Sequence, residues 1–317
     1  MNESPKVRFF GNFKKTYCSF FSPISQTETT SFDIYIYTIE TGGIVRSNTF
    51  LTDWYKNDNI GRNLKDKGKS HMNETTELLK KHVSVRQFLD KKINEEQVKE
   101  LILAAQSASS ASFLQAYTII GVEYDKLKGK IAELAGNQPF ISEGSHFFVF
   151  CADLQRLHRL SQERNIDIQP MLEGVDAILA GAIDASLAAQ NMTVAAESMG
   201  LGICYIGGIR DAIVEISDLL ELPEYVFPVF GLVVGYPKAK NELKPRIPMA
   251  GIYHIDKYNK DTDEIINEYE ETTRRYYTNR IGNSSNKTWG DGTVNSFHRL
   301  SRMGMKDYLN KQGLAKK

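Results

Sequence analysis

The sequence lacks several features that would place it in a special class of protein. No apolar run is long and uncharged enough to span a bilayer, and the N-terminus has no charged-then-apolar signal-peptide pattern. Its three cysteines show neither metal-ligand spacing nor a disulfide framework. We therefore expect a cytoplasmic protein in a reducing compartment. Cys151 and Cys204 lie in apolar strand-like runs, which predicts buried, inert thiols.

An excess of charge of either sign is also missing. The chain of 317 residues carries 39 basic and 39 acidic side chains, which argues against a nucleic-acid or polybasic membrane surface as its main function. Walker loops, CxxC pairs, HExxH and GxSxG motifs are absent from the sequence. Six histidines are scattered without metal-ligand spacing, so we assign no metal.

Residues 1–71 differ from the rest of the chain. They lack helical period, and residues 33–39 predict a low-charge strand that is prone to aggregate if it stays unpaired. Residues 64–71 are rich in amino acids with purine-rich codons, as a translated ribosome-binding site would be. We expect the fold to begin at Met72 and to occupy residues 72–317, with 1–71 as an extension outside it. A genuine appended region of unknown purpose is the alternative.

A long helix from Gly174 to Met199 is the strongest single pattern. Its apolar residues follow three- and four-residue spacing, and its many Ala and Gly residues let neighbouring helices approach closely, so burial on most sides is expected. Gly200 is placed to end it with a left-handed cap. A short strand, Ile203 to Ile206, then leads to Gly207-Gly208 and Arg210. By itself a glycine pair also fits an ordinary turn.

Two short segments offer rows of hydrogen-bond donors. If His82-Val-Ser-Val-Arg86 is extended, His82, Ser84 and Arg86 share one face above an apolar backing, which suits a phosphate. A solvated strand edge is the equally weighted alternative. Pro245 keeps its surroundings extended, so Lys244 and Arg246 also share a side.

The remaining pattern predicts strands separated by helices. Strands are expected over 117–122, 145–151 and 226–235, the last two buried on both faces because their apolar runs do not alternate. Helices are expected over 74–81, 94–108, 124–135, 154–164 and 263–277, the second opened by a capping box of Asn94 and Gln97. This arrangement indicates an α/β or α+β domain with one sheet. Asp176 and Asp184 lie on the long helix, where hydrogen-bonded carboxylates are favoured over catalytic ones.

Taken together, the segments resemble the oxygen-insensitive nitroreductase family, in its larger, NADPH-preferring branch that includes flavin reductases. The resemblance covers residues 74–317. It rests on motifs that stand in the family's order: residues 82–88, 109–115, 136–138, 200–202, 205–208, 243–246 and 307–313.

The resemblance implies an α+β fold with a central mixed sheet, a long buried central helix and an FMN-binding homodimer. It implies that the FMN phosphate is held by five side chains: His82, Ser84, Arg86, Lys244 and Arg246. Flavin ring and ribityl contacts would come from Ser110, Ser112, Gln138, Tyr205, Ile206, Gly207 and Gly208. Arg210 and Arg302 match positions that engage NADPH. Asp176 stands where the family often has Glu.

The function that the resemblance implies is NADPH-dependent reduction of nitroaromatics, quinones or free flavin by ping-pong two-electron hydride transfer. The flavin would carry the chemistry, so no catalytic side chain is assigned. Two alternatives remain at this point. One is a same-fold flavoenzyme of other activity, such as a dehalogenase or a flavin-consuming enzyme, and the other is a flavin-binding redox protein without turnover.

Overall fold

The structure is a computed structural model, and it describes residues 16–19, 35–40, 43–47, 73–239, 241–280, 282–299 and 302–317. The chain divides into two compact units, Met1–Met72 and Asn73–Lys317. In the first unit, β1 (Thr16–Ser19), β2 (Tyr35–Glu40) and β3 (Gly43–Ser47) form an antiparallel sheet with β2 in the middle. The strand predicted over residues 33–39 therefore falls on β2. Residues 64–71 and Met72, the expected start of the fold, lie outside the described residues.

The second unit is built on a four-stranded sheet in the order β4-β5-β7-β6. Its strands are β4 (Tyr117–Val122), β5 (His146–Asp153), β6 (Gly202–Ile206) and β7 (Val226–Gly235), close to the predicted ranges. All three strand pairs are antiparallel. A parallel bridge between Ser84 and Ile203 adds the parallel component of the expected mixed sheet. The outermost strands, β4 and β6, are thus separated by two others.

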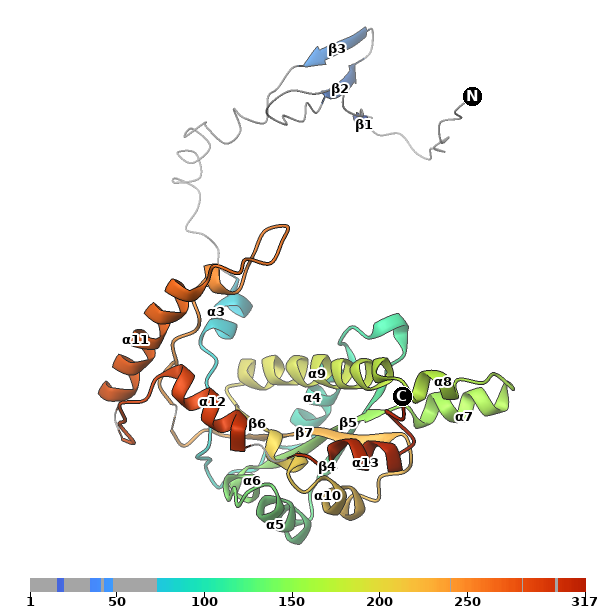
Figure 1. The fold of residues 1–317 in the computed structure, drawn as a ribbon, viewed down its shortest axis with the longest axis vertical. Coiled ribbons are helices and arrows are strands. Elements are labelled where there is room, and N and C mark those ends of the chain that lie inside the picture. Colours follow the sequence, from blue (N-terminus) through green and yellow to red (C-terminus); the bar gives the residue numbers. More distant parts are fainter. Residues whose placement is uncertain are drawn as a thin grey trace. The chain divides into compact units, whose positions relative to one another are not determined.

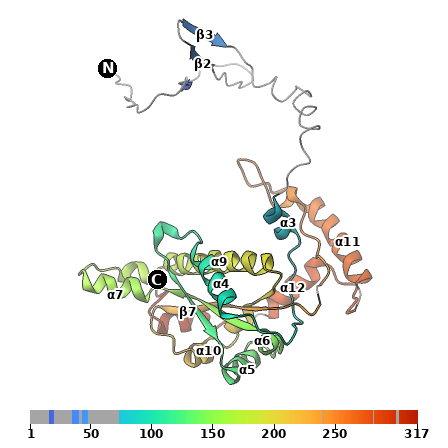
Figure 2. The same ribbon diagram turned by 180° about the vertical axis from the view of Figure 1, so that it is seen from behind.

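Helices cover both faces of this sheet, as Figures 1 and 2 show. On one face lie α4 (Glu95–Gln106) and α9 (Val175–Ser198), and on the other lie α5 (Asp125–Leu134), α6 (Phe140–Glu143) and α10 (Ile213–Leu219). The shorter elements are α3 (Glu74–Lys80), η1 (Ala111–Phe113), α7 (Gln155–Glu163), α8 (Gln169–Leu172), η2 (Gly207–Arg210) and η3 (Met249–Gly251). The chain ends with α11 (Asp263–Asn279), α12 (Trp289–Arg299) and α13 (Met305–Lys311).

Strand β5 is buried on both faces, as its unbroken apolar run predicts. Phe147 and Val149 enter the core under α5 and α10, whereas Phe148 and Phe150 enter the core under α4 and α9. Cys151 is fully buried, and burial raises the pKa of its thiol to about 12. Cys204 on β6 is also a buried free thiol whose pKa is raised by burial. The predicted burial is confirmed for both residues, and their raised pKa values agree with the prediction that the thiols are inert.

Short sequence motifs determine where helices α4 and α9 begin or end. Asn94 and Gln97 form the predicted capping box at the start of α4, with the Asn94 side chain accepting from the Gln97 N–H at 2.8 Å. Gly200 has φ +76° directly after α9, which is the left-handed conformation predicted for it. No helix in the described part of the chain is long and apolar enough to cross a membrane.

Helix α9 is buried on one face only. Ala185, Ala188 and Met192 pack against the sheet with no exposed surface. The opposite face carries a ridge of large apolar side chains at four-residue spacing, all of them about half exposed: Val175, Leu179, Ile183 and Leu187. The burial on most sides that the sequence predicts is therefore not reached within a single chain. Asp176 is exposed as well, so it is not one of the buried carboxylates of this helix.

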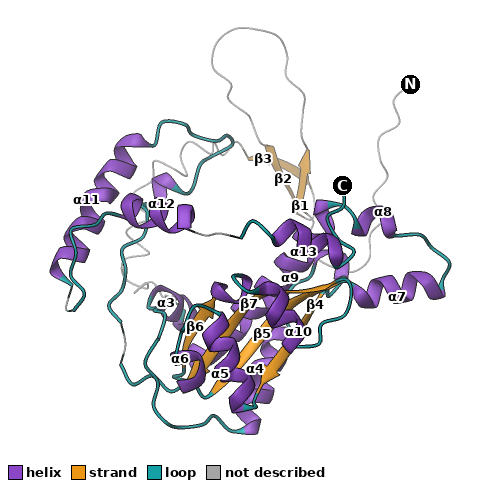
Figure 3. Cartoon of the chain, turned by 60° about the horizontal axis from the view of Figure 1, so that its bottom comes forward, coloured by secondary structure: helices purple, strands orange, loops and turns teal. Residues whose placement is uncertain are grey.

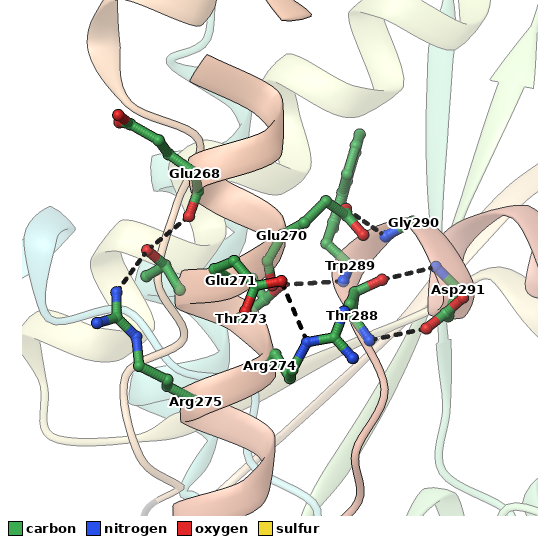
Figure 4. Close-up of polar contacts among 11 residues, drawn as sticks. Glu268, Glu270, Glu271, Thr273, Arg274, Arg275, Thr288, Trp289, Gly290 and Asp291 are labelled. Atoms are coloured by element: carbon green, nitrogen blue, oxygen red, sulfur yellow. Dashed lines mark hydrogen bonds and ion pairs between the residues drawn. The ribbon is translucent and has the colours of Figure 1, made fainter. Parts of the chain in front are cut away.

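Helices α11 and α12 are joined by polar contacts (Figure 4). The Glu270 carboxylate accepts from the Gly290 N–H at 2.7 Å, and the Thr273 hydroxyl accepts from the Trp289 N–H at 2.9 Å. The Trp289 ring lies 5.7 Å from that of Tyr269. These bonds satisfy the free N–H groups at the start of α12, which would otherwise lack partners.

The end of the C-terminal tail belongs to the core of its own unit. Tyr308, Leu309 and Leu314 are buried in a cluster with Phe227 at the start of β7. The Tyr308 hydroxyl lies 2.7 Å from that of Ser217 on α10.

Candidate functional site

A cationic cavity of about 350 Å³ brings together two segments that are far apart in the sequence. His82, Ser84 and Arg86 line it from one side, and Lys244 and Arg246 from the other. All five residues predicted from the family resemblance to hold a phosphate thus face one space. The other lining residues are Val83, Asn241, Glu242, Tyr276 and Arg280.

The first segment is held by β6. The Val85 N–H donates to the Ile203 carbonyl at 2.8 Å, which keeps this stretch extended beside the sheet. Val85 is 2% exposed, and a Cβ on Gly202 would come within 2.6 Å of its side chain. Val85 is therefore the apolar backing, and Ser84 and Arg86 line the cavity as predicted. The alternation is not complete, because Val83 lines the cavity as well.

The second segment is tied to the first and to α11. The Asn241 amide donates to the Ser84 carbonyl at 2.6 Å, and the Tyr269 hydroxyl donates to the Pro245 carbonyl at 3.0 Å. Partial burial and the neighbouring Arg86, Arg280 and Arg246 lower the pKa of Lys244. The part of this shift that comes from the arginines reflects repulsion between cations, so an anion in the cavity would be stabilised.

Sequence reasoning missed three of the cavity's polar side chains. Tyr276 and Arg280 come from the C-terminal end of α11, four residues apart, and Asn241 precedes Lys244. The four-residue spacing places Tyr276 and Arg280 on one side of the chain, a signal that could have paired them. The sequence does not say that this helix end returns to residues 82–86, because that contact depends on the tertiary fold.

A second group of predicted residues meets at the turn after β6. A Cβ on Gly208 would clash with the Ala135 carbonyl and would lie 2.9 Å from the Gln138 side chain. Gln138 itself donates to that carbonyl, so it lies directly beside Gly208. The packing of this chain alone therefore requires glycine at position 208. At Gly207 the nearest atoms, at 3.5 and 4.0 Å, are guanidinium nitrogens of Arg210 and Arg302.

Both arginines are engaged at this turn. Arg302 donates to Asp211 at 2.8 Å and to the Gly207 carbonyl at 3.1 Å, and Arg210 donates to the Val229 carbonyl. Burial and the charge of Arg302 lower the pKa of Arg210. Two positive charges thus converge beside the glycine turn, although the two residues are far apart in sequence.

Tyr205 and Ile206 point to opposite faces of the sheet. Ile206 is 1% exposed within the core under α5 and α10, so only its backbone is available to a ligand. Tyr205 lies on the α9 side, where its hydroxyl accepts from Thr193 at 3.0 Å and burial raises its pKa. Its ring packs edge-on against Phe230.

The predicted serines lie at the other edge of the sheet. The loop that contains Ser110 and Ser112 precedes β4, whereas Gly207 follows β6, and three strand spacings amount to about 14 Å (Figure 3). One chain therefore does not bring these serines to its own glycine turn.

Asp184 holds that serine loop in place. This carboxylate is 1% exposed and accepts from the Ser110 hydroxyl at 2.8 Å, the Ala111 N–H at 3.1 Å and the Ala116 N–H at 2.9 Å. The prediction of a hydrogen-bonded Asp184 is confirmed. Ser112 and Phe113 have φ of 47° and 58°, a region that non-glycine residues rarely adopt. The strained loop presents Phe113 to solvent, 81% exposed.

An apolar groove of about 490 Å³ runs along the exposed ridge of α9. Leu179, Ile183 and Leu187 line it from the helix, and Tyr205 and Phe230 line it from the sheet. Contiguous apolar surface of this kind on a folded chain indicates an interaction site.

Comparison with known proteins places this arrangement in a family. Residues 79–236 match the nitroreductase family, and residues 244–317 match the C-terminal domain of the nitroreductase family. An FMN reductase (NADPH) of Bacillus subtilis (strain 168) is 42% identical over 248 residues, which are 77% of this chain and 100% of that protein. A Cr(VI) reductase of Pseudomonas sp. (strain G-1) is 42% identical over 238 residues, 75% of this chain and 97% of that protein.

Comparison with a solved structure indicates the same family. The nitroreductase NfrA1 of B. subtilis superposes with a TM-score of 0.74 at 42% identity, over 77% of this chain and 100% of its own. The FMN and NADPH predicted from the sequence agree with the name of the first relative. The chain belongs to the nitroreductase family and is an oxidoreductase.

Proposed function

We propose that this protein is an FMN-dependent oxidoreductase that takes electrons from NADPH and works as a homodimer in the cytoplasm. The observation that carries the proposal is the cavity in which His82, Ser84, Arg86, Lys244 and Arg246 converge. Partial burial and then the neighbouring arginines lower the pKa of Lys244. A phosphate dianion offsets that repulsion and accepts charge-assisted hydrogen bonds from these side chains.

The residues present fit FMN along the length of β6. From Ile203, beside the cavity, to Gly207 is four residues of strand, or about 13 Å, which a ribityl chain and ring system cover. At the far end Gly207 leaves room for a ring, and Gln138 lies beside Gly208 as a hydrogen-bonding side chain. When bound there, FMN supplies the hydride chemistry, and no side chain is assigned as a catalytic acid or base.

A second copy of the chain completes the site in this proposal. The loop of Ser110 and Ser112 is held away from its own glycine turn, at the opposite edge of the sheet. The groove along α9 is apolar and open, and a two-fold axis through it would place the same groove of a partner against it. Each chain would then offer its serine loop to the other chain's cofactor. The dimer would also bury the ridge of α9.

NADPH and the electron acceptor are proposed to use the same open side of the site in turn, which predicts ping-pong kinetics. Arg302 and Arg210 converge at Gly207, and their positive charge supports binding of the additional phosphate of NADPH. We propose nitroaromatics, quinones and free flavin as acceptors. A relative carries the name Cr(VI) reductase.

The proposed function is tested by steady-state oxidation of NADPH and of NADH with a nitroaromatic, a quinone and FMN as acceptors. Parallel double-reciprocal lines and a higher kcat/KM for NADPH are expected. Arg302→Ala is expected to lower the ratio of kcat/KM for NADPH to that for NADH by about tenfold, because one charge-assisted contact is lost.

The matched control is Arg299→Ala, which removes an exposed arginine at the end of α12. It should leave the nucleotide ratio unchanged. Absence of NADPH oxidation with every acceptor would reject the enzyme assignment. An unchanged ratio in both Arg302→Ala and Arg210→Ala would reject the placement of the nucleotide phosphate alone.

Residues 1–71 are proposed to be dispensable. The family match begins at residue 79, and Asn73–Lys317 is a compact unit that contains the whole cationic cavity. A chain beginning at Met72 should retain the FMN content, dimer state and NADPH turnover of the 317-residue chain, and should be at least as soluble. Thermal unfolding and turnover of the two chains side by side decide the question, and loss of flavin from the shorter chain would contradict the proposal.

A further inference from the structure

His82 is held by a carboxylate behind the cationic cavity. Its Nδ1 lies 2.6 Å from Oε1 of Glu197, whose side chain is 12% exposed, while that of His82 is 28% exposed. Among the described residues, His82 is the one side chain that forms an ion pair with Glu197. Glu197 does not line the cavity, so it would act on a bound anion through the imidazole.

The position of Glu197 is unfavourable without such a partner. It lies in the last turn of α9, where the helix macrodipole disfavours negative charge, and that turn has no basic residue. Its carboxylate is largely buried, and a buried charge needs compensation. Its charge also contributes, after burial, to the raised pKa of Tyr205. The contact with His82 is what satisfies this carboxylate.

The contact with Glu197 also determines which nitrogen of His82 faces the cavity. Because Nδ1 faces Glu197, Nε2 is the nitrogen that remains for a ligand. A phosphate oxygen requires a donor there. A ring that carries hydrogen on both nitrogens can donate to Glu197 and to the phosphate at the same time.

We propose that Glu197 is a positioning residue for phosphate recognition: it holds the His82 ring through Nδ1, so that Nε2 faces the FMN phosphate. This inference rests on the proposed FMN site. The other charged groups that face the cavity are Arg86, Lys244, Arg246, Arg280 and the acidic Glu242. Removal of Glu197 therefore weakens one contact to the phosphate while the remaining cations stay in place.

Riboflavin, which is FMN without the phosphate, separates this role from a purely structural one. Glu197→Gln keeps the shape of the side chain and removes its charge. We expect the Kd for FMN of the flavin-free dimer to rise about tenfold in this variant, because a charge-assisted hydrogen bond is weakened, while the Kd for riboflavin stays unchanged. Fluorescence titration of both flavins measures the two values. Glu215→Gln, an exposed glutamate on α10 at the other face of the sheet, is the matched control.

A second comparison, made in His82→Ala protein, tests whether Glu197 changes the Kd for FMN through His82. In His82→Ala protein, adding Glu197→Gln should leave the Kd for FMN unchanged or lower it, because an unpaired carboxylate near the cavity repels the phosphate. The inference is overturned if Glu197→Gln leaves FMN binding unchanged, strengthens it, or weakens FMN and riboflavin equally. Failure of the unaltered protein to bind FMN more tightly than riboflavin would instead reject the proposed phosphate site.

Discussion

Replacing Leu187 by aspartate is expected to split the dimer and to remove most of the bound FMN. Leu187 lies on the exposed apolar ridge of α9 and lines the groove in which we propose that a second copy packs. An unpaired charge buried in an interface costs about 3–5 kcal/mol, and the two-fold symmetry places two such charges there. The dimer dissociation constant should therefore rise by about four decades or more.

The expected loss of flavin follows from the proposal that two chains share each site. A monomer retains the cationic cavity but lacks the partner's loop of Ser110 and Ser112. Leu187 is 41% exposed in the single chain, so the substitution should leave the fold of the chain itself intact. Sedimentation velocity and flavin absorbance of the same sample, with circular dichroism for the fold, measure all three properties.

Val214→Asp is the matched control for this experiment. Val214 on α10 is 46% exposed and lies away from α9, on the other face of the sheet. This variant should remain a dimer with its full complement of FMN. A Leu187→Asp protein that stays dimeric at low micromolar concentration, or a fully active monomer, would show that the groove is not the interface.

Arg86→Ala is expected to raise the Kd for FMN by about one to two decades. The substitution removes a charge-assisted donor set worth about 1.5–3 kcal/mol from the cavity that is proposed to hold the phosphate. Titration of flavin-free protein with FMN measures the change.

Lys99→Ala controls for the loss of a positive charge alone, because Lys99 is an exposed residue of α4 that does not line the cavity. It should bind FMN as the unaltered protein does. Full FMN occupancy of Arg86→Ala protein at limiting flavin would contradict the phosphate assignment.

The sequence predicts those parts of the fold that local chemistry determines. Asn94 and Gln97 determine the start of α4, and Gly200 ends α9, because these signals act within a few residues of the chain. The apolar run of β5 likewise reveals burial on both faces. The donor row of residues 82–86 was recognisable because a strand alternates its side chains.

The sequence does not reveal which edges of the sheet its segments reach. The strand order places Ser110 and Gly208 at opposite edges of the sheet, and no local sequence pattern encodes that order. The return of Arg280 to the cavity depends on how α11 is anchored, through contacts such as the one between Tyr269 and the Pro245 carbonyl. Gly208 was predicted from the family resemblance as a flavin contact, and the sequence does not reveal that the Ala135 carbonyl also requires glycine there.

The most direct test of the account is the identity of the flavin carried by the purified protein. The protein should be yellow, the colour should travel with the dimer in size-exclusion chromatography, and denaturation should release FMN in about one copy per chain. The cavity that carries the proposal gathers cationic side chains that would bind a terminal phosphate monoester. A colourless protein that does not take up added FMN, or one that releases FAD or riboflavin instead, would contradict the account.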